Sequence, residues 1–272
     1  MTTKTLAGAL LLALLLPLST AAPSSAKLSA AAHGTAATHP CKNIAHRGMW
    51  QGTEEQVEGA TRNARWGFVE IDARMTSDGQ IVALHDSTMT RPSGGASTAD
   101  VGSLSLVEIR ALPFVLGDRV ERTRRLIRVA ATEDVPIMVT INSYSRYQEQ
   151  WDNGGLATLW EAAQLHPRPG TVYFGGSGGE EAMQEAFPDA KTFHRYGDSA
   201  DVLDLATGAG VDLAGLPRSL FDSDRVHDLR DAGVRVATNQ LESEEAVDDA
   251  LAVGIRLVQT DRSRRTVLDW CS

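Results

Sequence analysis

Short apolar runs alternate with longer stretches of mixed polarity along most of this chain. A continuous apolar run of about four to eight residues is typical of a buried parallel strand, and the stretches between such runs have the length of crossover helices. We predict strands at 43–46, 68–73, 136–142, 171–175, 191–195, 211–216, 234–238 and 255–260. We predict helices at 54–66, 122–133, 156–165, 179–187, 199–208, 222–232, 243–253 and 264–270. Strands and helices that alternate in this number predict a TIM (β/α)8 barrel.

A turn motif predicts one further strand after the second barrel strand. The sequence Ser77-Asp78-Gly79 is typical of a tight hairpin, and the apolar run 80–84 follows it directly. We therefore expect residues 80–84 to return antiparallel to the second strand. The segment 86–105 is rich in glycine, serine and threonine, so we expect a surface loop near the barrel mouth rather than a mobile lid.

The amino-terminal segment has the pattern of a secretory signal. Lys4 precedes an apolar core at 6–16, which is shorter than the roughly 20 residues that a membrane-spanning helix needs. We expect residues 1–26 to be a signal peptide, residues 27–40 a disordered leader, and residues 41–272 the barrel domain. No lipid-attachment cysteine follows the apolar core closely, so we expect a secreted, extracellular protein without a stable membrane anchor.

Charge and cysteine content narrow the partners and the redox state. The formal net charge of −9 argues against nucleic acid or an anionic membrane as the main partner. It does not argue against a phosphodiester, because a bound cation would reverse the local field. Cys41 and Cys271 form an even pair in a chain expected to be secreted, which favours a disulfide over two buried free thiols. The last helix would bring Cys271 back to the face of the barrel where Cys41 lies.

Polar groups follow three of the predicted strands abruptly. Glu70 and Asp72 are two residues apart on a strand, so both point to the same face. Adjacent carboxylates repel each other unless a cation or a proton lies between them, and oxygen ligands suit Mg²⁺ or Ca²⁺. His46 and His85 each end an apolar run and could supply an acid and a base. Arg47 offers a planar fork that suits phosphate.

These blocks resemble the glycerophosphodiester phosphodiesterase family of PLC-like phosphodiesterase TIM barrels. That family has His-Arg-Gly at its first strand, Glu-x-Asp at its second, a Thr-x-Asp-Gly turn and a strand that ends in His-Asp. The chain has these blocks in the same order, at 46–48, 70–72, 76–79 and 85–86, with a Thr-Asp-Arg at 260–262 that matches the family's last strand. The resemblance covers roughly residues 43 to 265. It implies catalytic His46 and His85, metal ligands Glu70 and Asp72, and substrate-binding Arg47.

The third barrel strand departs from the family pattern. The family has Glu-x-Lys there, with the Glu as a third metal ligand and the Lys beside the phosphate, whereas this chain has Thr140 and Asn142. Asn142 can still donate to a phosphate oxygen, so we retain it as a substrate-binding residue. Loss of both charges indicates a different substrate or weakened catalysis.

Two further positions have weaker support. Glu55 lies where the family opens its first helix with Glu-Asn-Thr, so we expect it to support the site, although a Glu in a first helical turn is favoured by the helix dipole anyway. His194 and Arg195 also end an apolar run and could reach the barrel mouth, but no family motif covers them. For Glu70 and Asp72 the plainer alternative is a buried ion pair with a nearby arginine.

The sequence thus predicts a secreted, metal-assisted phosphodiesterase of lipid metabolism. We expect a monomer that acts on small phosphodiesters of the glycerophosphodiester or lysophospholipid type and does not bind nucleic acid. The alternative is a catalytically degenerate, phosphate-binding member of the same barrel family, for which Thr140 and Asn142 are the evidence. A third alternative is a secreted lyase on the same barrel, similar to the phospholipase D toxins.

Overall fold

The structure is a computed structural model that describes residues 41–49, 52–57, 59–63, 67–176, 178–197 and 201–271. The predicted signal peptide and leader, residues 1–40, lie outside the described residues, so both stay predictions. The compact unit described below lies within residues 39–272.

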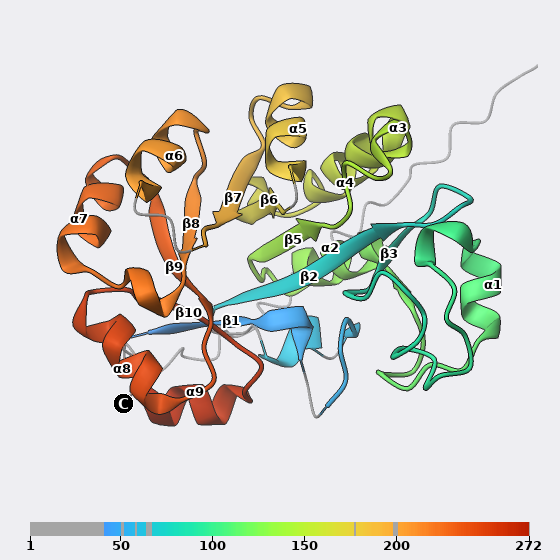
Figure 1. The fold of residues 1–272 in the computed structure, drawn as a ribbon, viewed down its shortest axis with the longest axis horizontal. Helices are drawn as coiled ribbons and strands as arrows, with labels where there is room; N and C mark the ends of the chain where they lie inside the picture. Colours follow the sequence, from blue (N-terminus) through green and yellow to red (C-terminus); the bar gives the residue numbers. More distant parts are fainter. Residues whose placement is uncertain are drawn as a thin grey trace, which may run out of the picture. The chain divides into compact units, whose positions relative to one another are not determined.

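Eight parallel strands of the described residues close into a barrel (Figure 1). They are β1 (Lys42–Ala45), β2 (Phe68–Met75), β5 (Ile137–Ile141), β6 (Val172–Gly175), β7 (Lys191–Arg195), β8 (Leu213–Leu216), β9 (Arg235–Gln240) and β10 (Leu257–Thr260). Their order is β1-β10-β9-β8-β7-β6-β5-β2, and the pairing of β1 with β2 closes the ring. Every predicted strand overlaps an observed one, and the predicted TIM (β/α)8 barrel is confirmed.

The barrel interior is filled by one buried side chain from each of the eight strands. These side chains are Ile44, Phe68, Met138, Tyr173, Phe193, Leu213, Ala237 and Leu257. Because side chains alternate along a strand, the residues two positions further on also point inward, closer to the carboxyl ends of the strands. On β2, β5 and β7 those residues are Glu70, Thr140 and Arg195. The polar site therefore lies directly above an apolar plug, at the barrel face where active sites of this fold are found.

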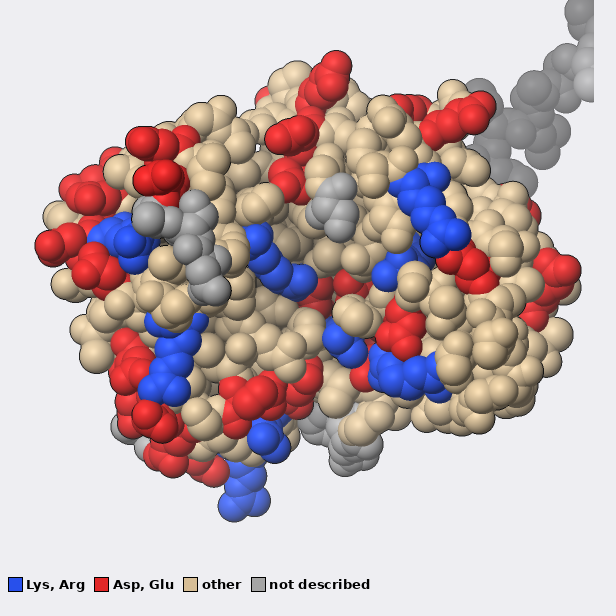
Figure 2. Space-filling view, in the orientation of Figure 1, with Lys and Arg blue, Asp and Glu red and all other residues tan. Residues whose placement is uncertain are grey.

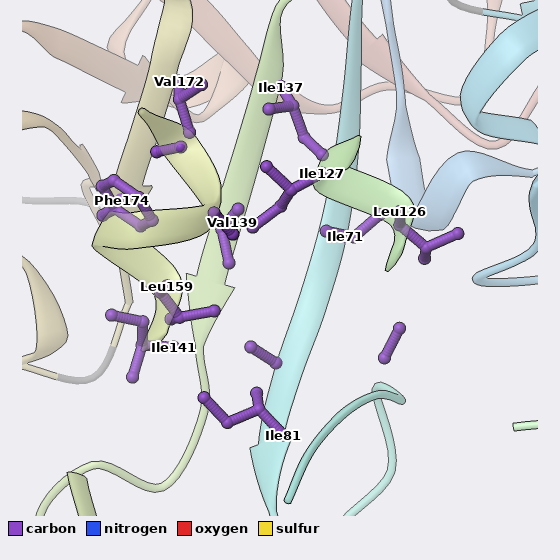
Figure 3. Close-up of a cluster of buried hydrophobic side chains, with 14 of the residues drawn as sticks. Ile71, Ile81, Leu126, Ile127, Ile137, Val139, Ile141, Leu159, Val172 and Phe174 are labelled. Carbon is purple, nitrogen blue, oxygen red and sulfur yellow. The ribbon is translucent and has the colours of Figure 1, made fainter. Parts of the chain in front are cut away.

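Helices cover the outside of the barrel (Figure 1). They are α2 (Thr123–Thr132), α3 (Gln148–Gln150), α4 (Leu156–Ala163), α5 (Gly179–Ala186), α6 (Val202–Gly208), α7 (Ser223–Asp231), α8 (Glu244–Ala252) and α9 (Arg264–Trp270). Figure 3 shows part of the layer between strands and helices, where Ile71, Val139 and Ile127 lie together. Full burial of each such side chain contributes about 1.5–3 kcal/mol. Among the described residues, no helix is long and apolar enough to cross a membrane.

A small excursion extends the sheet beyond β2. β3 (Ile81–Ala83) pairs antiparallel with β2, which confirms the predicted extra strand. β4 (Glu121–Arg122) pairs with β3, and α1 (Leu106–Ala111) packs on a separate buried cluster that includes Val82 and Leu84. The sequence predicted neither α1 nor β4, because elements of 6 and 2 residues are too short to show a period.

The helix predicted over 54–66 is wrong in its first part. Glu55 has a left-handed φ of 56°, and its N–H donates to the Arg47 carbonyl at 2.7 Å, so no helix begins there. The described helical part is one π-helical turn at Gly59–Asn63. Gly59 lies so close to Gly48 that a Cβ on it would be 1.5 Å from the Gly48 carbonyl oxygen. Close backbone packing around the first strand overrides the local helical pattern.

A disulfide joins the two ends of the described chain. Cys41 precedes β1 and Cys271 follows α9, and their Cα atoms are 5.7 Å apart. Both cysteines are buried. This arrangement agrees with the predicted pairing, and the bond closes a loop with a sequence separation of 230 residues.

Candidate active site

The polar residues of the site gather at the carboxyl ends of the barrel strands. Figure 2 shows a hollow in the middle of this face, with acidic and basic side chains around it. Glu70 and Asp72 from β2 lie beside Thr140 from β5, which pairs with Asp72 in the sheet register. His46 follows β1 directly as the first residue of the 3₁₀ turn His46–Gly48. The structure therefore brings the predicted His and carboxylate residues to one place.

His46 is held by a carboxylate from the last strand end. Its Nδ1 lies 2.6 Å from Asp261 Oδ1, and Asp261 Oδ2 accepts a hydrogen bond from Gln240 Nε2 at 2.6 Å. Burial alone would raise the pKa of Asp261, but the hydrogen bond and the charge of His46 lower it below its usual value. An ionised Asp261 requires Nδ1 to carry the proton, which leaves Nε2 to exchange a proton with a substrate. Nε2 lies 4.0 Å from Glu70 Oε2.

His85 is oriented in the same manner by its neighbour in the chain. Its Nδ1 lies 3.0 Å from Asp86 Oδ1, and its side chain is 43% exposed. Arg91 donates to both Asp86 oxygens, at 2.7 and 2.8 Å, and its other contacts reach both oxygens of Glu54. The hydrogen bonds from Arg91 are the main reason that the pKa of Asp86 is lowered to about 2. A chain of fixed charges thus holds the second histidine at the site entrance.

Arg47 contributes through its backbone as well as its side chain. Its φ of 52° is left-handed, and in this conformation its N–H donates to Glu70 Oε2 at 2.9 Å. The guanidinium Nη1 lies 3.5 Å from Glu54 Oε2, and Nε is buried without a hydrogen-bond partner among the described residues. Glu55 and Ser143, both close to the site, also have a positive φ. Such strained backbone is typical of functional sites.

Glu70 is fully buried and strongly bound on both oxygens. Oε1 accepts from Thr140 Oγ1 at 2.5 Å and lies 2.8 Å from Arg195 Nη2. Burial would raise the pKa of Glu70, but the charges of Arg195 and His46 and the hydrogen bond from Thr140 lower it to about 2. Glu70 is therefore an ionised carboxylate at any pH at which the protein would act.

Asp72 and Glu55 form a second acidic pair beside Glu70. Asp72 Oδ1 accepts from Asn142 Nδ2 at 2.5 Å, and the Asp72 N–H donates to Glu55 Oε1 at 3.0 Å. Burial, and then the charge of Glu70, raises the pKa of Asp72. Burial, and then the charges of Asp72 and Glu70, raises the pKa of Glu55 well above its usual value. Asn142 thus uses one amide hydrogen on a carboxylate, and its predicted contact with substrate stays a prediction.

The acidic pair determines whether a cation fits. Asp72 Oδ2 and Glu55 Oε2 are buried and have no hydrogen-bond partner within the described part of the chain. Two such carboxylate oxygens repel each other unless a proton or a cation lies between them, and they are the hard donors that Mg²⁺ and Ca²⁺ prefer. No group of three His, Cys, Asp or Glu side chains in the described residues converges as a preformed metal site. The donor chemistry fits a cation at Asp72 and Glu55, whereas the Glu70 oxygens already have partners.

Arg195 is a site residue to which the sequence assigned no role. It was noted only because an apolar run ends beside it. The sequence feature that could have located it is its spacing from Phe193: Phe193 lies in the barrel interior, and a residue two positions further along a strand points to the same side. His194 between them faces the other way, and its Nδ1 lies 2.5 Å from Glu180 Oε1. Asp261 was placed at the correct strand end, but its contact with His46 depends on tertiary structure.

Two histidines held by carboxylates, beside buried acidic side chains at a TIM-barrel mouth, define a site for acid–base hydrolysis. Residues 46–168 match the model of the glycerophosphoryl diester phosphodiesterase family, and this match confirms the resemblance found in the sequence. The members of this family are phosphoric diester hydrolases and are generally metal-dependent. The match supports a glycerophosphodiester phosphodiesterase-like function for this chain. No curated protein sequence matches it.

Solved structures of the same fold cover most of the described barrel. A phosphodiesterase from Oleispira antarctica, in complex with the product sn-glycerol-3-phosphate, is 18% identical with a TM-score of 0.71 and covers 84% of this chain and 96% of its own. A glycerophosphodiester phosphodiesterase from Parabacteroides distasonis is 14% identical with a TM-score of 0.68, over 84% and 96%. One from Thermotoga maritima is 17% identical with a TM-score of 0.64, over 84% and 97%. At these identities the likeness shows the fold.

Proposed function

We propose that the protein is a secreted, metal-assisted phosphodiesterase that hydrolyses glycerophosphodiesters or similar lysophospholipid-type substrates. One observation supports this proposal above all others. His46 and His85 are each held by an aspartate: His46 Nδ1 lies 2.6 Å from Asp261 Oδ1 with Nε2 4.0 Å from Glu70 Oε2, and His85 Nδ1 lies 3.0 Å from Asp86 Oδ1. Two carboxylate-held imidazoles at one barrel mouth can accept and donate the two protons that hydrolysis of a phosphodiester transfers.

The two histidines divide the proton transfers of hydrolysis between them. One takes a proton from the attacking water, or from a neighbouring hydroxyl of the substrate, as the new oxygen–phosphorus bond forms. The other gives a proton to the leaving alkoxide as the old bond breaks, so that one alcohol and one phosphate monoester result when water attacks. Asp261 and Asp86 hold the ring nitrogens that do not react. Attack by a substrate hydroxyl would first give a cyclic phosphate.

Positive charge around the phosphate comes from the chain and from a cation. Arg47 lies in the 3₁₀ turn that follows β1, and its guanidinium has N–H donors for a non-bridging phosphoryl oxygen. Asp72 and Glu55 would hold the cation, Mg²⁺ or Ca²⁺, through the oxygens that lack partners among the described residues. When bound, such an ion polarises a phosphoryl oxygen. Glu70, with its charge matched by Arg195, keeps the inner wall of the site ionised and fixed.

A secreted location is part of the proposal and rests on residues 1–26. A charged start, a short apolar core and small residues support a cleaved signal peptide. The disulfide between Cys41 and Cys271 supports an oxidising compartment. Amino-terminal sequencing of protein recovered from the culture medium tests this point, and a mature chain that begins at residue 22 or residue 27 is the expected result.

The alternative function is a phosphate-binding protein that has lost catalysis. Its evidence is Thr140 and Asn142. These neutral side chains stand at the third barrel strand where the family has a metal-binding Glu and a phosphate-binding Lys. The intact contacts of His46 and His85 favour an enzyme, because a binding protein has no need of two carboxylate-held proton carriers.

The test is hydrolysis of glycerophosphocholine by the wild type and three variants. His46→Ala and His85→Ala should each lower kcat by at least about 100-fold, since general acid–base catalysis contributes about 10²–10⁴-fold. His227→Ala is the matched control, because His227 is exposed on α7 and its Nε2 lies 3.4 Å from Asp231, away from the site. Retained turnover in both site variants would refute the scheme. Wild-type protein that binds sn-glycerol 3-phosphate but turns over no diester would favour the binding protein.

A further inference from the structure

The positive charge missing from the third barrel strand, β5, has a counterpart on β7, two strands further round the barrel mouth. Thr140 on β5 donates to Glu70, and Asn142, which directly follows β5, donates to Asp72; both side chains are neutral. Arg195, at the end of β7, brings a guanidinium to the same carboxylate from across the mouth. We propose that Arg195 binds a non-bridging phosphoryl oxygen of the substrate and supplies the charge that the third strand lacks. This inference rests on the proposed function.

The backbone directs Arg195 into the barrel. Phe193, two residues earlier, is fully buried in the interior layer, so Arg195 points to the same side. The guanidinium carbon lies 5.6 Å from the centre of the Phe193 ring, and Nη2 lies 2.8 Å from Glu70 Oε1. The side chain is therefore fixed from below by an aromatic ring and at one edge by a carboxylate. A guanidinium held in this manner is pre-organised for a second anion.

The neighbouring strand makes room for this side chain. Arg195 pairs with Gly215 of β8 in the sheet register. A Cβ on Gly215 would lie 2.8 Å from Asn239 Oδ1 and 3.4 Å from Arg195 Cγ, so any larger residue would press on both side chains. The absence of a side chain at Gly215 lets the long arginine cross the mouth toward Glu70.

The guanidinium has donors left after its contact with Glu70. Glu70 is 0% exposed, whereas the Arg195 side chain is 29% exposed, so part of Arg195 extends from the buried carboxylate toward the open mouth. Its Nε and Nη2 are buried and form no hydrogen bond in the described residues, although Nη2 lies 2.8 Å from Glu70 Oε1 as an ion pair. Arginine carries five N–H donors in a planar fork, and a contact with one carboxylate oxygen does not use them all. Phosphate is the anion that this fork matches in two-point contacts.

Arg195 also lies beside the groups that move protons. His46 Nε2 is 4.0 Å from one oxygen of Glu70, and Arg195 Nη2 is 2.8 Å from the other. The imidazole and the guanidinium therefore flank a single carboxylate group. A phosphoryl oxygen bound by Arg195 would place the phosphorus within reach of an atom that His46 activates. Stabilisation of negative charge at this point acts on the transition state more than on the ground state.

The plainer reading is a structural ion pair, in which Arg195 only neutralises Glu70. The two readings differ in their consequences. A structural pair matters for stability and leaves phosphate affinity unchanged, whereas a phosphate ligand affects affinity and turnover together. Because loss of one member of a buried pair can prevent folding, the double variant Arg195→Met/Glu70→Gln removes both charges and preserves neutrality.

The experiment measures binding of sn-glycerol 3-phosphate by calorimetry and hydrolysis of glycerophosphocholine, with the thermal midpoint recorded for each variant. Arg195→Met should weaken binding by about 10- to 150-fold, the usual range for a hydrogen bond to a charged group. Arg195→Lys should recover part of this loss, because it keeps the charge without the fork. His194→Gln is the matched control on the same strand and should bind and turn over as the wild type does.

Four outcomes decide the matter. Weaker product binding and lower kcat/KM in folded Arg195→Met support the proposal. Weaker binding in this variant, together with a wild type that turns over no diester, supports Arg195 as the phosphate ligand and defeats the enzyme proposal alone. Unchanged binding and turnover in folded Arg195→Met, or in the double variant if the single one does not fold, overturn the proposal. A wild type that binds no sn-glycerol 3-phosphate overturns it as well.

Discussion

Replacement of Asp261 by asparagine tests the orientation of the first histidine. In the wild type, Asp261 Oδ1 lies 2.6 Å from His46 Nδ1, and Gln240 fixes the other carboxylate oxygen at 2.6 Å. Asp261→Asn keeps the shape of the side chain but removes the charge. A hydrogen bond to a charged group contributes about 1.5–3 kcal/mol. If this stabilisation acts on the imidazolium that forms in the transition state, kcat should fall by about 10- to 150-fold.

The assay compares steady-state hydrolysis of a glycerophosphodiester by Asp261→Asn and by a control of the same chemistry. Asp231→Asn is that control, since Asp231 contacts His227 at 3.4 Å on the exposed surface of α7. We expect KM to change little in Asp261→Asn, because Asp261 contacts the histidine and Gln240 rather than the mouth of the site. Equal kcat values for the two variants and the wild type would refute the view that Asp261 sets the proton-carrying state of His46.

Three further predictions concern stability and cation binding. Replacement of Cys41 and Cys271 by serine should lower the free energy of unfolding by up to about 5 kcal/mol in the chain-entropy model, and urea titration would measure the loss. Burial raises the pKa of Glu55, so the folded protein keeps a proton that the unfolded chain releases above about pH 4.3. The contribution of Glu55 to the free energy of unfolding is therefore complete below that pH and is lost as pH rises through the raised pKa. With chelator present, Glu55→Gln should accordingly have a higher thermal midpoint than the wild type at pH 7 and the same midpoint as the wild type near pH 4. Equal midpoints for variant and wild type at both pH values would contradict this. Mg²⁺ or Ca²⁺ should raise the thermal midpoint of the wild type but not that of Asp72→Asn, and a rise of equal size in both would exclude Asp72 as a ligand.

Much of the barrel could be predicted because its strands are short, fully buried and apolar. Ile137, Met138 and Val139 form a continuous apolar run, which is typical of a strand buried on both faces. Elements shaped by tertiary contact could not be found in this manner. Glu55 occupies a helical pattern but adopts a left-handed conformation, because its backbone is bound to Arg47 and its carboxylate to Asp72.

The site residues divide along the same line. His46 and His85 were found because each follows an apolar strand abruptly and fits a family motif. Neither Asp86 as the partner of His85 nor Arg91 as the partner of Asp86 was predicted, because the contact of Arg91 depends on the path of the loop after β3. Arg195 lies outside every motif, and only the inward phase of β7 places it at the mouth. The sequence shows which residues could react, whereas the structure shows which charges hold them.

Phosphorus NMR of glycerophosphocholine incubated with the protein tests the central claim most directly. The account predicts that the diester resonance declines and that a monoester resonance grows, either directly or after a cyclic phosphodiester, and that His46→Ala shows neither change. A diester resonance that persists unchanged with folded wild-type protein, Mg²⁺ or Ca²⁺ and intact Cys41–Cys271 would contradict the account.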